Sequence, residues 1–319
     1  MKTNRLPCLL PAAIELLEAR IAPATFLVTN LGDSGSGSLR DAVARANATP
    51  AQDIVLFEPS LAGTVLLQTG EILVTEPLTL KGPSSRSVTL DGNQNSRILN
   101  ISSAFVTISN LGFENGRATL ENGGAILSDE ALSIENCRFE GNTASEGGAV
   151  YVSTFSSKKL TIKSTLVDGN VADSGAGGGL FLDTFGPINL IDSTIRGNTA
   201  TQGAGGVYLH TFESAVRITD CTVTENVAGF NGGGMLLLAI DSKTFIKGSV
   251  FTKNVIAAGS NGGGGGLYSL GGDLDLKNVI LAENTADHGG GASIFADKAR
   301  IVSTSVSRNT SIAPGAPRG

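Results

Sequence analysis

The stretch FEGNTASEGGAVYV, Phe139 to Val152, joins an apolar strand end, an asparagine, a polar turn, two glycines and a second strand. Five later segments repeat this order with small changes: VDGNVADSGAGGGLFL, IRGNTATQGAGGVYL, VTENVAGFNGGGMLL, FTKNVIAAGSNGGGGGLY and LAENTADHGGGASI. A pattern that recurs at a nearly fixed period along a chain indicates a repeat architecture.

The asparagine of the repeat recurs in steps of 28, 28, 28, 28, 30 and 25 residues. Its positions are Asn142, Asn170, Asn198, Asn226, Asn254, Asn284 and Asn309. An apolar residue lies three positions before each asparagine, and the extra residues fall in the glycine-rich segment. We expect these asparagines to form a structural ladder at a sharp corner, where asparagine tolerates left-handed backbone angles and its amide can bond along the stack.

The repeat unit carries strand signals and lacks helical ones. Short runs of alternating polarity, such as LSI at 132–134 and AVYV at 149–152, are separated by Gly, Asn and Ser turns. Successive coils of about 28 residues would place like residues above one another and pair each strand in parallel with its counterpart. The sequence therefore predicts an all-β fold, a right-handed parallel β-helix of about ten coils.

The domain organisation follows from the limits of the repeat. We expect a leader at residues 1–24, the β-helix with its N-terminal cap (25–60) at residues 25–312, and a flexible tail at 313–319. In the segment 38–48, Leu39, Ala42, Val43 and Ala46 lie on one face of a predicted short helix. This helix would cover the open first coil, because an exposed sheet edge invites aggregation.

Composition excludes several classes of protein. The formal net charge is −6 and there is no basic run, so no nucleic-acid partner is expected. No apolar run approaches the roughly 20 residues of a membrane span. Cys137 and Cys221 lie three coils apart, or roughly 14 Å at about 4.8 Å per coil, beyond the roughly 7 Å at which a disulfide forms. With Cys8 in the leader, we expect no disulfide, no metal cluster and no cofactor.

Three segments resemble known families. The motifs GGAI (123–126), GGAV (147–150), FEGN (139–142) and FTKN (251–254) resemble the repeats of chlamydial polymorphic outer membrane proteins. The segment 28–57, with GSLRDAV, is similar to the CSLREA-type region that precedes such β-helices. The leader segment LLEARIAPATF (16–26) resembles that of planctomycete surface proteins, although an ordinary N-terminal helix is the alternative. The resemblance implies a secreted, cell-surface or outer membrane-associated protein with an adhesive or structural role.

One candidate binding stripe comes from aligning the coils on their glycines. Tyr151, Phe181, Tyr208, Leu236 and Tyr268 would then point outward in one row, where aromatic rings can stack on sugars or anchor a protein. Two residues further on, Asp183 and His210 would be neighbours that can form a hydrogen bond. The alternatives are that glycine-rich loops cover the row, or that it is ordinary cross-strand packing.

The predicted function is a non-catalytic adhesive or structural module. Its partners would be a surface polysaccharide, a protein, or further copies of the chain bound through the C-terminal coil. The alternative is a pectin-lyase-like β-helix that binds or degrades polysaccharide with the aromatic stripe. Two or more carboxylates beside the stripe would favour that enzyme, whereas Asp273 and Asp275 lack the longer repeat of calcium-binding coils.

Overall fold

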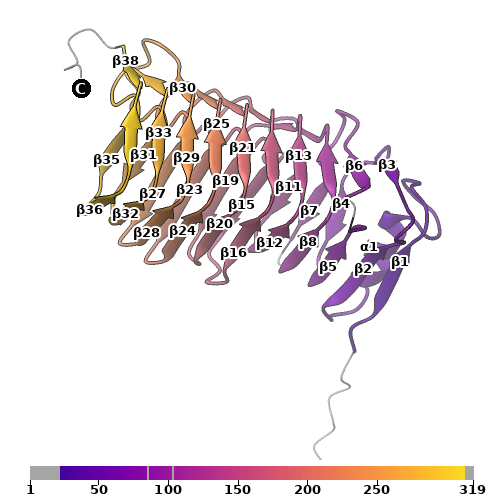
Figure 1. Cartoon of the computed structure of the whole chain (residues 1–319). Coiled ribbons are helices and arrows are strands. Elements are labelled where there is room, and N and C mark those ends of the chain that lie inside the picture. Colours follow the sequence, from indigo (N-terminus) through magenta and orange to yellow (C-terminus); the bar gives the residue numbers. More distant parts are fainter. Residues whose placement is uncertain (1–21, 85, 103, 313–319) are drawn as a thin grey trace, which may run out of the picture.

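The computed structural model describes residues 22–84, 86–102 and 104–312. Most of the predicted leader, including Cys8, and the predicted tail at 313–319 lie outside these residues. The described chain is a right-handed parallel β-solenoid of about 10 turns, as the repeat predicts. Figure 1 shows the coils stacked side by side from the N-terminal to the C-terminal end.

Four parallel sheets run the length of the solenoid, and a complete coil contributes one strand to each in the order A, B, D, C. Sheet A contains β1 (Thr25–Val28), β2 (Asp53–Phe57), β5 (Leu78–Lys81), β8 (Val106–Ser109), β12 (Leu132–Glu135), β16 (Leu160–Lys163), β20 (Ile188–Ile191), β24 (Ala215–Thr219), β28 (Lys243–Lys247), β32 (Asp273–Lys277) and β36 (Lys298–Val302). Sheet B contains β3 (Gly63–Leu66), β6 (Val88–Asp91), β9 (Gly112–Glu114), β13 (Arg138–Glu140), β17 (Leu166–Asp168), β21 (Thr194–Arg196), β25 (Thr222–Thr224), β29 (Val250–Thr252), β33 (Ile280–Ala282) and β37 (Ser305–Ser307).

The two remaining sheets complete each coil. Sheet D contains β10 (Arg117–Ala118), β14 (Thr143–Ala144), β18 (Val171–Ala172), β22 (Thr199–Ala200), β26 (Val227–Ala228), β30 (Val255–Ile256), β34 (Thr285–Ala286) and β38 (Thr310–Ser311). Sheet C contains β4 (Ile72–Val74), β7 (Leu99–Ile101), β11 (Ile126–Ser128), β15 (Val150–Thr154), β19 (Leu180–Thr184), β23 (Val207–Phe212), β27 (Met235–Ile240), β31 (Leu267–Leu270) and β35 (Ala292–Phe295).

The core lies inside the coils and is built from columns of like side chains. Phe113 and Phe139 are fully buried on adjacent coils, with their rings stacked at a centroid distance of 4.8 Å. The column continues through Val167, Ile195, Val223 and Phe251, the apolar residues three positions before each asparagine. The register is fixed because a shift of one residue would turn each inward side chain to solvent.

The predicted asparagine ladder is present in full. In Asn170, the main-chain N–H and the amide Nδ2 both donate to Oδ1 of Asn198, at 3.0 and 2.9 Å. Nδ2 also donates to the carbonyl of Phe139 at 3.1 Å, and the same pattern repeats along the row. The side chains from Asn142 to Asn284 are completely buried. The ladder therefore satisfies corner N–H and C=O groups that the four sheets leave unpaired.

The predicted reason for asparagine at this corner is wrong in one respect. None of the ladder asparagines has a positive φ angle; the residue before each of them takes the left-handed conformation. That residue is Gly141, Gly169, Gly197, Glu225, Lys253, Glu283 or Arg308, with φ between 54° and 62°. Asparagine is therefore required for its buried amide, and the residue before it makes the turn.

A second ladder holds the two described cysteines. Cys137, Thr165, Ser193, Cys221 and Ser249 occupy equivalent positions, and the hydroxyl of Ser249 accepts the N–H of Cys221 at 3.1 Å. Both thiols are free and buried. Burial raises the pKa of the Cys137 thiol to about 12 and that of Cys221 to about 11, so both behave as small buried residues, as predicted.

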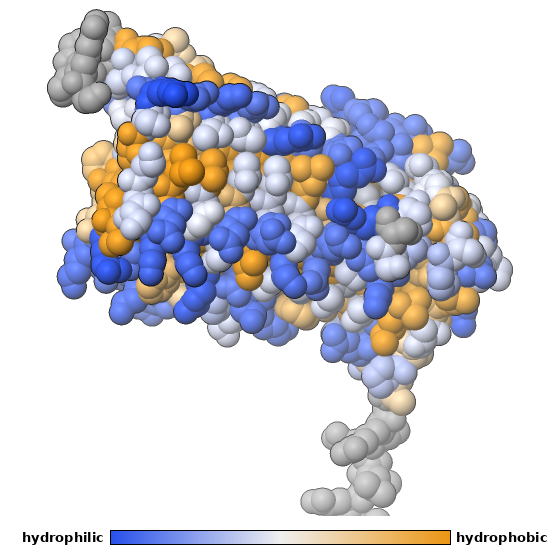
Figure 2. Space-filling model, in the orientation of Figure 1, coloured by the Kyte–Doolittle hydropathy of each residue, from blue (hydrophilic) through white to orange (hydrophobic). Residues whose placement is uncertain are grey.

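The N-terminal end is covered as expected. Helix α1 (Leu39–Ala46) buries the predicted face of Leu39, Ala42, Val43 and Ala46 against the first coils. Ser38 caps it by accepting the N–H of Asp41 at 3.2 Å. At the opposite end, Figure 2 shows apolar residues gathering over the last described coils, where Ile301 and Val306 are 55% and 63% exposed.

Replacing one rung of the asparagine ladder tests its contribution to stability. In Asn198→Ala, the main-chain N–H of Asn170 and the carbonyl of Val167 lose their side-chain partners, and Asn170 Nδ2 keeps only its bonds to main-chain carbonyls. We expect the free energy of unfolding to fall by roughly 3 kcal/mol or more, since each unsatisfied buried group costs about 1–3 kcal/mol. Urea unfolding followed by circular dichroism measures this change. The exposed neighbour provides a control, Thr199→Ala, for which we expect about 0.5 kcal/mol or less; equal losses would contradict the ladder's role.

Candidate functional site

The outward face of sheet C carries three parallel rows of side chains, since alternate residues of a strand point to the same side. The pairing of β15, β19 and β23 sets these rows in register. We call the nine residues the sheet C strip: Tyr151, Ser153 and Phe155 on β15 and its end; Phe181, Asp183 and Phe185 on the next coil; and Tyr208, His210 and Phe212 on the third.

The aromatic row of the strip lies where the sequence predicts it. Tyr151 pairs with Phe181 and Phe181 with Tyr208, and Leu236 separates these three from Tyr268. The rings stack nearly parallel, with centroids 4.6 and 4.3 Å apart and planes 17° and 10° from one another. Phe181 thus has both faces covered and is only 8% exposed. Most of the ring faces in this row are used within the protein, as the cross-strand packing alternative requires.

The predicted pairing of Asp183 with His210 is also present. His210 Nδ1 lies 2.8 Å from Asp183 Oδ1, and the two side chains are 28% and 34% exposed. An imidazole whose Nδ1–H donates to a carboxylate has a fixed tautomer, with Nε2 left as an acceptor. The pair sits in the middle row of the strip, between the aromatic row and the row of phenylalanines.

A second carboxylate, Glu146, lies beside the aromatic row. Its charge acts on both Tyr151 and Tyr208, whose hydroxyl pKa values are raised, chiefly by burial. Burial also raises the pKa of the Glu146 carboxyl, partly offset by the N–H of Ala176. The side chain packs against the next turn, because a Cβ on Gly175 would come within 2.5 Å of Glu146 Cγ, and it stays partly exposed, with Asn122 Nδ2 donating to Oε2 at 3.5 Å.

The phenylalanine row was missed by the sequence analysis. Phe155 is 89% exposed and Phe185 41%, and the ring centroids from Phe155 through Phe185 to Phe212 are 5.4 and 6.0 Å apart. Neighbouring planes are tilted by 43° and 53°, so these rings do not cover each other's faces as the aromatic row does. The signal in the sequence is the dipeptide Thr-Phe, which ends three consecutive sheet C strands.

The threonines explain why the phenylalanines point outward. Thr154 and Thr184 are buried, and their hydroxyls accept the N–H groups of Ser156 and Gly186 at 3.1 and 3.0 Å. Each such turn ends the strand with the threonine inside. The phenylalanine that follows is therefore on the outer face, at the corner between sheets C and A.

Elsewhere on the surface, charged side chains pair along the axis with the neighbouring coil. Lys163 binds Glu135 at 2.6 Å and Arg196 binds Asp168 at 2.5 Å. Asp275 binds Arg300 at 3.1 Å, and Asp273 lies between Lys243 and Lys298 in the register. Among residues 22–84, 86–102 and 104–312, no group of three His, Cys, Asp or Glu side chains could hold a metal ion.

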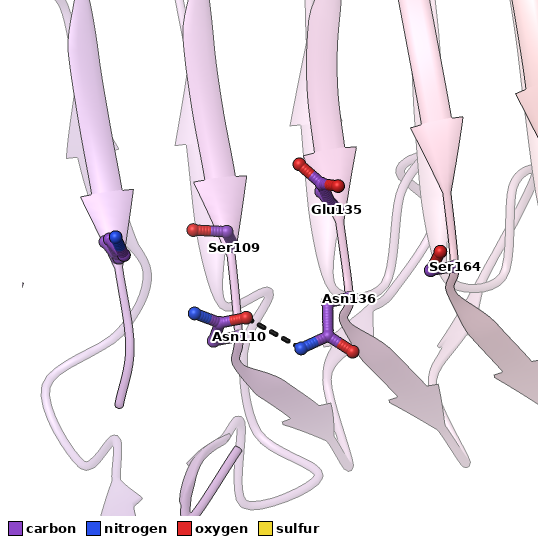
Figure 3. Close-up of a pocket in the computed structure, with 6 residues that line it drawn as sticks. Ser109, Asn110, Glu135, Asn136 and Ser164 are labelled. Atoms are coloured by element: carbon purple, nitrogen blue, oxygen red, sulfur yellow. Dashed lines mark hydrogen bonds between the residues drawn. The ribbon is translucent and has the colours of Figure 1, made fainter. Parts of the chain in front are cut away.

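A hollow at the corner of sheets A and B shows the same pairing. Figure 3 shows Asn110 and Asn136 side by side on adjacent coils, with Asn136 Nδ2 donating to Asn110 Oδ1 at 2.7 Å. Ser109, Glu135, Ser164 and Lys81 complete its lining. Of its polar groups, the two asparagines bind each other, while Glu135 binds Lys163 and Ser164 binds Asp192, both outside the hollow.

Comparison with known proteins agrees with the fold. The family model described as the right-handed β-helix region matches residues 81–236. Among solved structures, pectate lyase Pel9A is similar at 15% identity and a TM-score of 0.48, covering 93% of this chain and 80% of that chain. The A-module of Azotobacter vinelandii mannuronan C-5 epimerase AlgE4 is similar at 10% identity and a TM-score of 0.47, covering 93% of this chain and 100% of that chain. No curated protein sequence matches the chain.

The raised pKa of Glu146 predicts a pH-dependent effect on stability. A carboxyl whose pKa is raised on folding stabilises the folded state at pH values below the pKa of the unfolded chain. This contribution is lost as the pH rises through the higher pKa of the folded state. Glu146→Gln removes the charge and keeps an oxygen for the N–H of Ala176. We expect a melting temperature higher by about 1–2 °C near pH 7 and unchanged near pH 4, measured by scanning calorimetry; the same shift at both pH values would contradict the assignment.

Proposed function

We propose that this protein is a non-catalytic secreted or cell-surface module that adheres to a partner through the sheet C strip. The observation that carries the proposal is the row of exposed, unstacked rings at Phe155 and Phe185, on a rigid sheet. Large aromatic side chains anchor interfaces at low entropic cost because they have few rotatable bonds. The resemblance of the leader and the repeats to those of surface proteins supports the location. No helix among the described residues is long and apolar enough to cross a membrane.

The charged groups in and beside the sheet C strip support a surface that binds without catalysing a reaction. Asp183 is bound to His210, and Glu146 accepts a main-chain N–H from the next coil. Carboxylates on the other sheets form ion pairs along the axis, as Asp168 does with Arg196. Such pairs fix side chains between coils, which suits a rigid module displaying a constant surface.

A polysaccharide-degrading enzyme is the second candidate. The specific observation in its favour is that two carboxylates, Glu146 and Asp183, flank the aromatic row, and Asp183 orients His210. Glu146 with its raised pKa would be the general acid, and His210 the general base. We favour adhesion because Glu146 precedes β15 whereas Phe155 follows it, so the carboxylate and the exposed phenylalanines lie at opposite ends of the strand.

A combined binding and turnover screen tests the proposal. The full chain is applied to immobilised polysaccharides, to immobilised surface proteins and to itself, while release of reducing ends and of unsaturated products is followed. We expect saturable binding without product release, weakened in Phe155→Ala and unchanged in Phe230→Ala, an exposed aromatic outside the strip.

Two results would contradict the proposal. Product release that disappears in Glu146→Gln or His210→Ala would identify the protein as an enzyme. If wild type and Phe155→Ala bind equally strongly, the adhesive surface is not the sheet C strip. The same conclusion follows if the chain binds only to other copies of itself.

A further inference from the structure

The sheet C strip has the pattern of a surface that recognises one elongated ligand. Two rows of rings flank a middle row whose polar groups are Ser153, Asp183 and His210. Each row contributes one side chain per coil, so an aromatic contact recurs in both ring rows at the coil spacing of about 4.8 Å, while the polar group of the middle row differs from coil to coil. A ligand that repeats along its own length can use the rings of each coil in the same way.

The phenylalanine row sets the chemistry of one side of the ligand. Ring centroids 5.4 and 6.0 Å apart are separated by about the length of one pyranose unit, and Phe155 and Phe185 are 89% and 41% exposed while Phe212 is half-buried. The C–H face of a pyranose ring packs on an exposed aromatic face, where apolar area is buried on both sides.

The middle row sets the polar contacts. Asp183 uses Oδ1 to bind His210 Nδ1, and both side chains are partly exposed. The second carboxylate oxygen and the imidazole Nε2 can therefore accept hydrogen bonds from ligand hydroxyl groups. A saccharide offers such hydroxyls at the edge of the ring whose face meets the phenylalanine.

The charge around the strip selects against an anionic ligand. Its own carboxylate is Asp183, and Glu146 lies beside Tyr151 and Tyr208. Two cations lie in the turn after Phe155: Lys158 is bound to Glu130 at 3.0 Å and lies over the ring of Phe105, at 5.9 Å, and Lys159 is exposed. With a net charge of −6 on the whole chain, a polyanion would be repelled.

We propose that the sheet C strip binds an uncharged polysaccharide whose chain lies parallel to the long axis of the solenoid. One sugar unit stacks on each phenylalanine, and the hydroxyl edges of the central units bond to Asp183 and His210. This inference rests on the proposed adhesive function and specifies its ligand class, orientation and contacts.

The test uses titration calorimetry of the full chain with neutral and acidic hexasaccharides. The neutral probes are cellohexaose, laminarihexaose, maltohexaose and mannohexaose, and the acidic probe is hexagalacturonate. For the neutral probe that binds, shorter oligomers are then compared. We expect affinity to rise with length up to about three or four units, because three coils at about 4.8 Å each set the length of the strip, and hexagalacturonate to bind more weakly.

Paired variants locate the contact. Phe185→Ala should lower affinity for the neutral hexasaccharide about tenfold, the usual effect of removing an aromatic anchor. Phe245→Ala is the matched control, because Phe245 is also 41% exposed but lies on β28 of sheet A; its affinity should equal that of wild type. Circular dichroism verifies that both variants fold.

The outcomes separate this inference from the broader proposal. Equal affinity in Phe185→Ala and wild type, no increase with oligomer length, or stronger binding of hexagalacturonate would each overturn the inference. If no neutral hexasaccharide binds but an immobilised protein binds and loses affinity in Phe155→Ala, the proposed adhesive function is supported and the proposed saccharide ligand is wrong.

Discussion

Each buried asparagine amide in the solenoid depends on the same amide one coil further along. Asn142 donates to Asn170, Asn170 to Asn198, and so on to Asn309. An amide in this row is satisfied only when neighbouring coils are in register, because any slip would leave buried donors without partners. The register of the asparagines therefore fixes the register of the core columns. Sheet C follows the glycine-rich segment of variable length and is aligned by main-chain bonds between glycines, such as Gly179 N–H to the carbonyl of Gly206 at 3.1 Å.

Because the coils stack in register, side chains at the same outward position of successive coils form a row. The residue types in a row determine how its side chains interact. Opposite charges in a row neutralise each other, as Glu135 and Lys163 do. Flat rings at paired positions within neighbouring strands stack face to face, as Phe181 does with Tyr208. Rings at a corner, where the turns differ from coil to coil, are held at an angle to one another. The phenylalanine row is of this last kind, and Phe155 and Phe185 in it are exposed.

Much of this arrangement can be predicted from the sequence, because the period of the asparagines determines which residues are neighbours. The buried columns follow from that period, the meeting of Asp183 with His210 follows from aligning the coils on their glycines, and the capping face of α1 follows from helical spacing. What the period leaves open is conformation within a coil. It does not show that Gly141 or Glu225, and not the following asparagine, takes the left-handed turn, nor how two rings are tilted. Phe155 was missed because the alignment on glycines stopped two residues short of it.

The surface assigned to binding can be tested directly by hydroxyl-radical footprinting, which reports the accessibility of individual aromatic and histidine side chains. The full chain is oxidised alone and with the polysaccharide that binds it most strongly, and peptides are compared by mass spectrometry. We expect protection of Phe155, Phe185, Phe212 and His210, with Phe230 and Phe245 oxidised equally in both samples. Protection of Phe230 or Phe245 with unchanged oxidation of the sheet C strip would contradict this assignment.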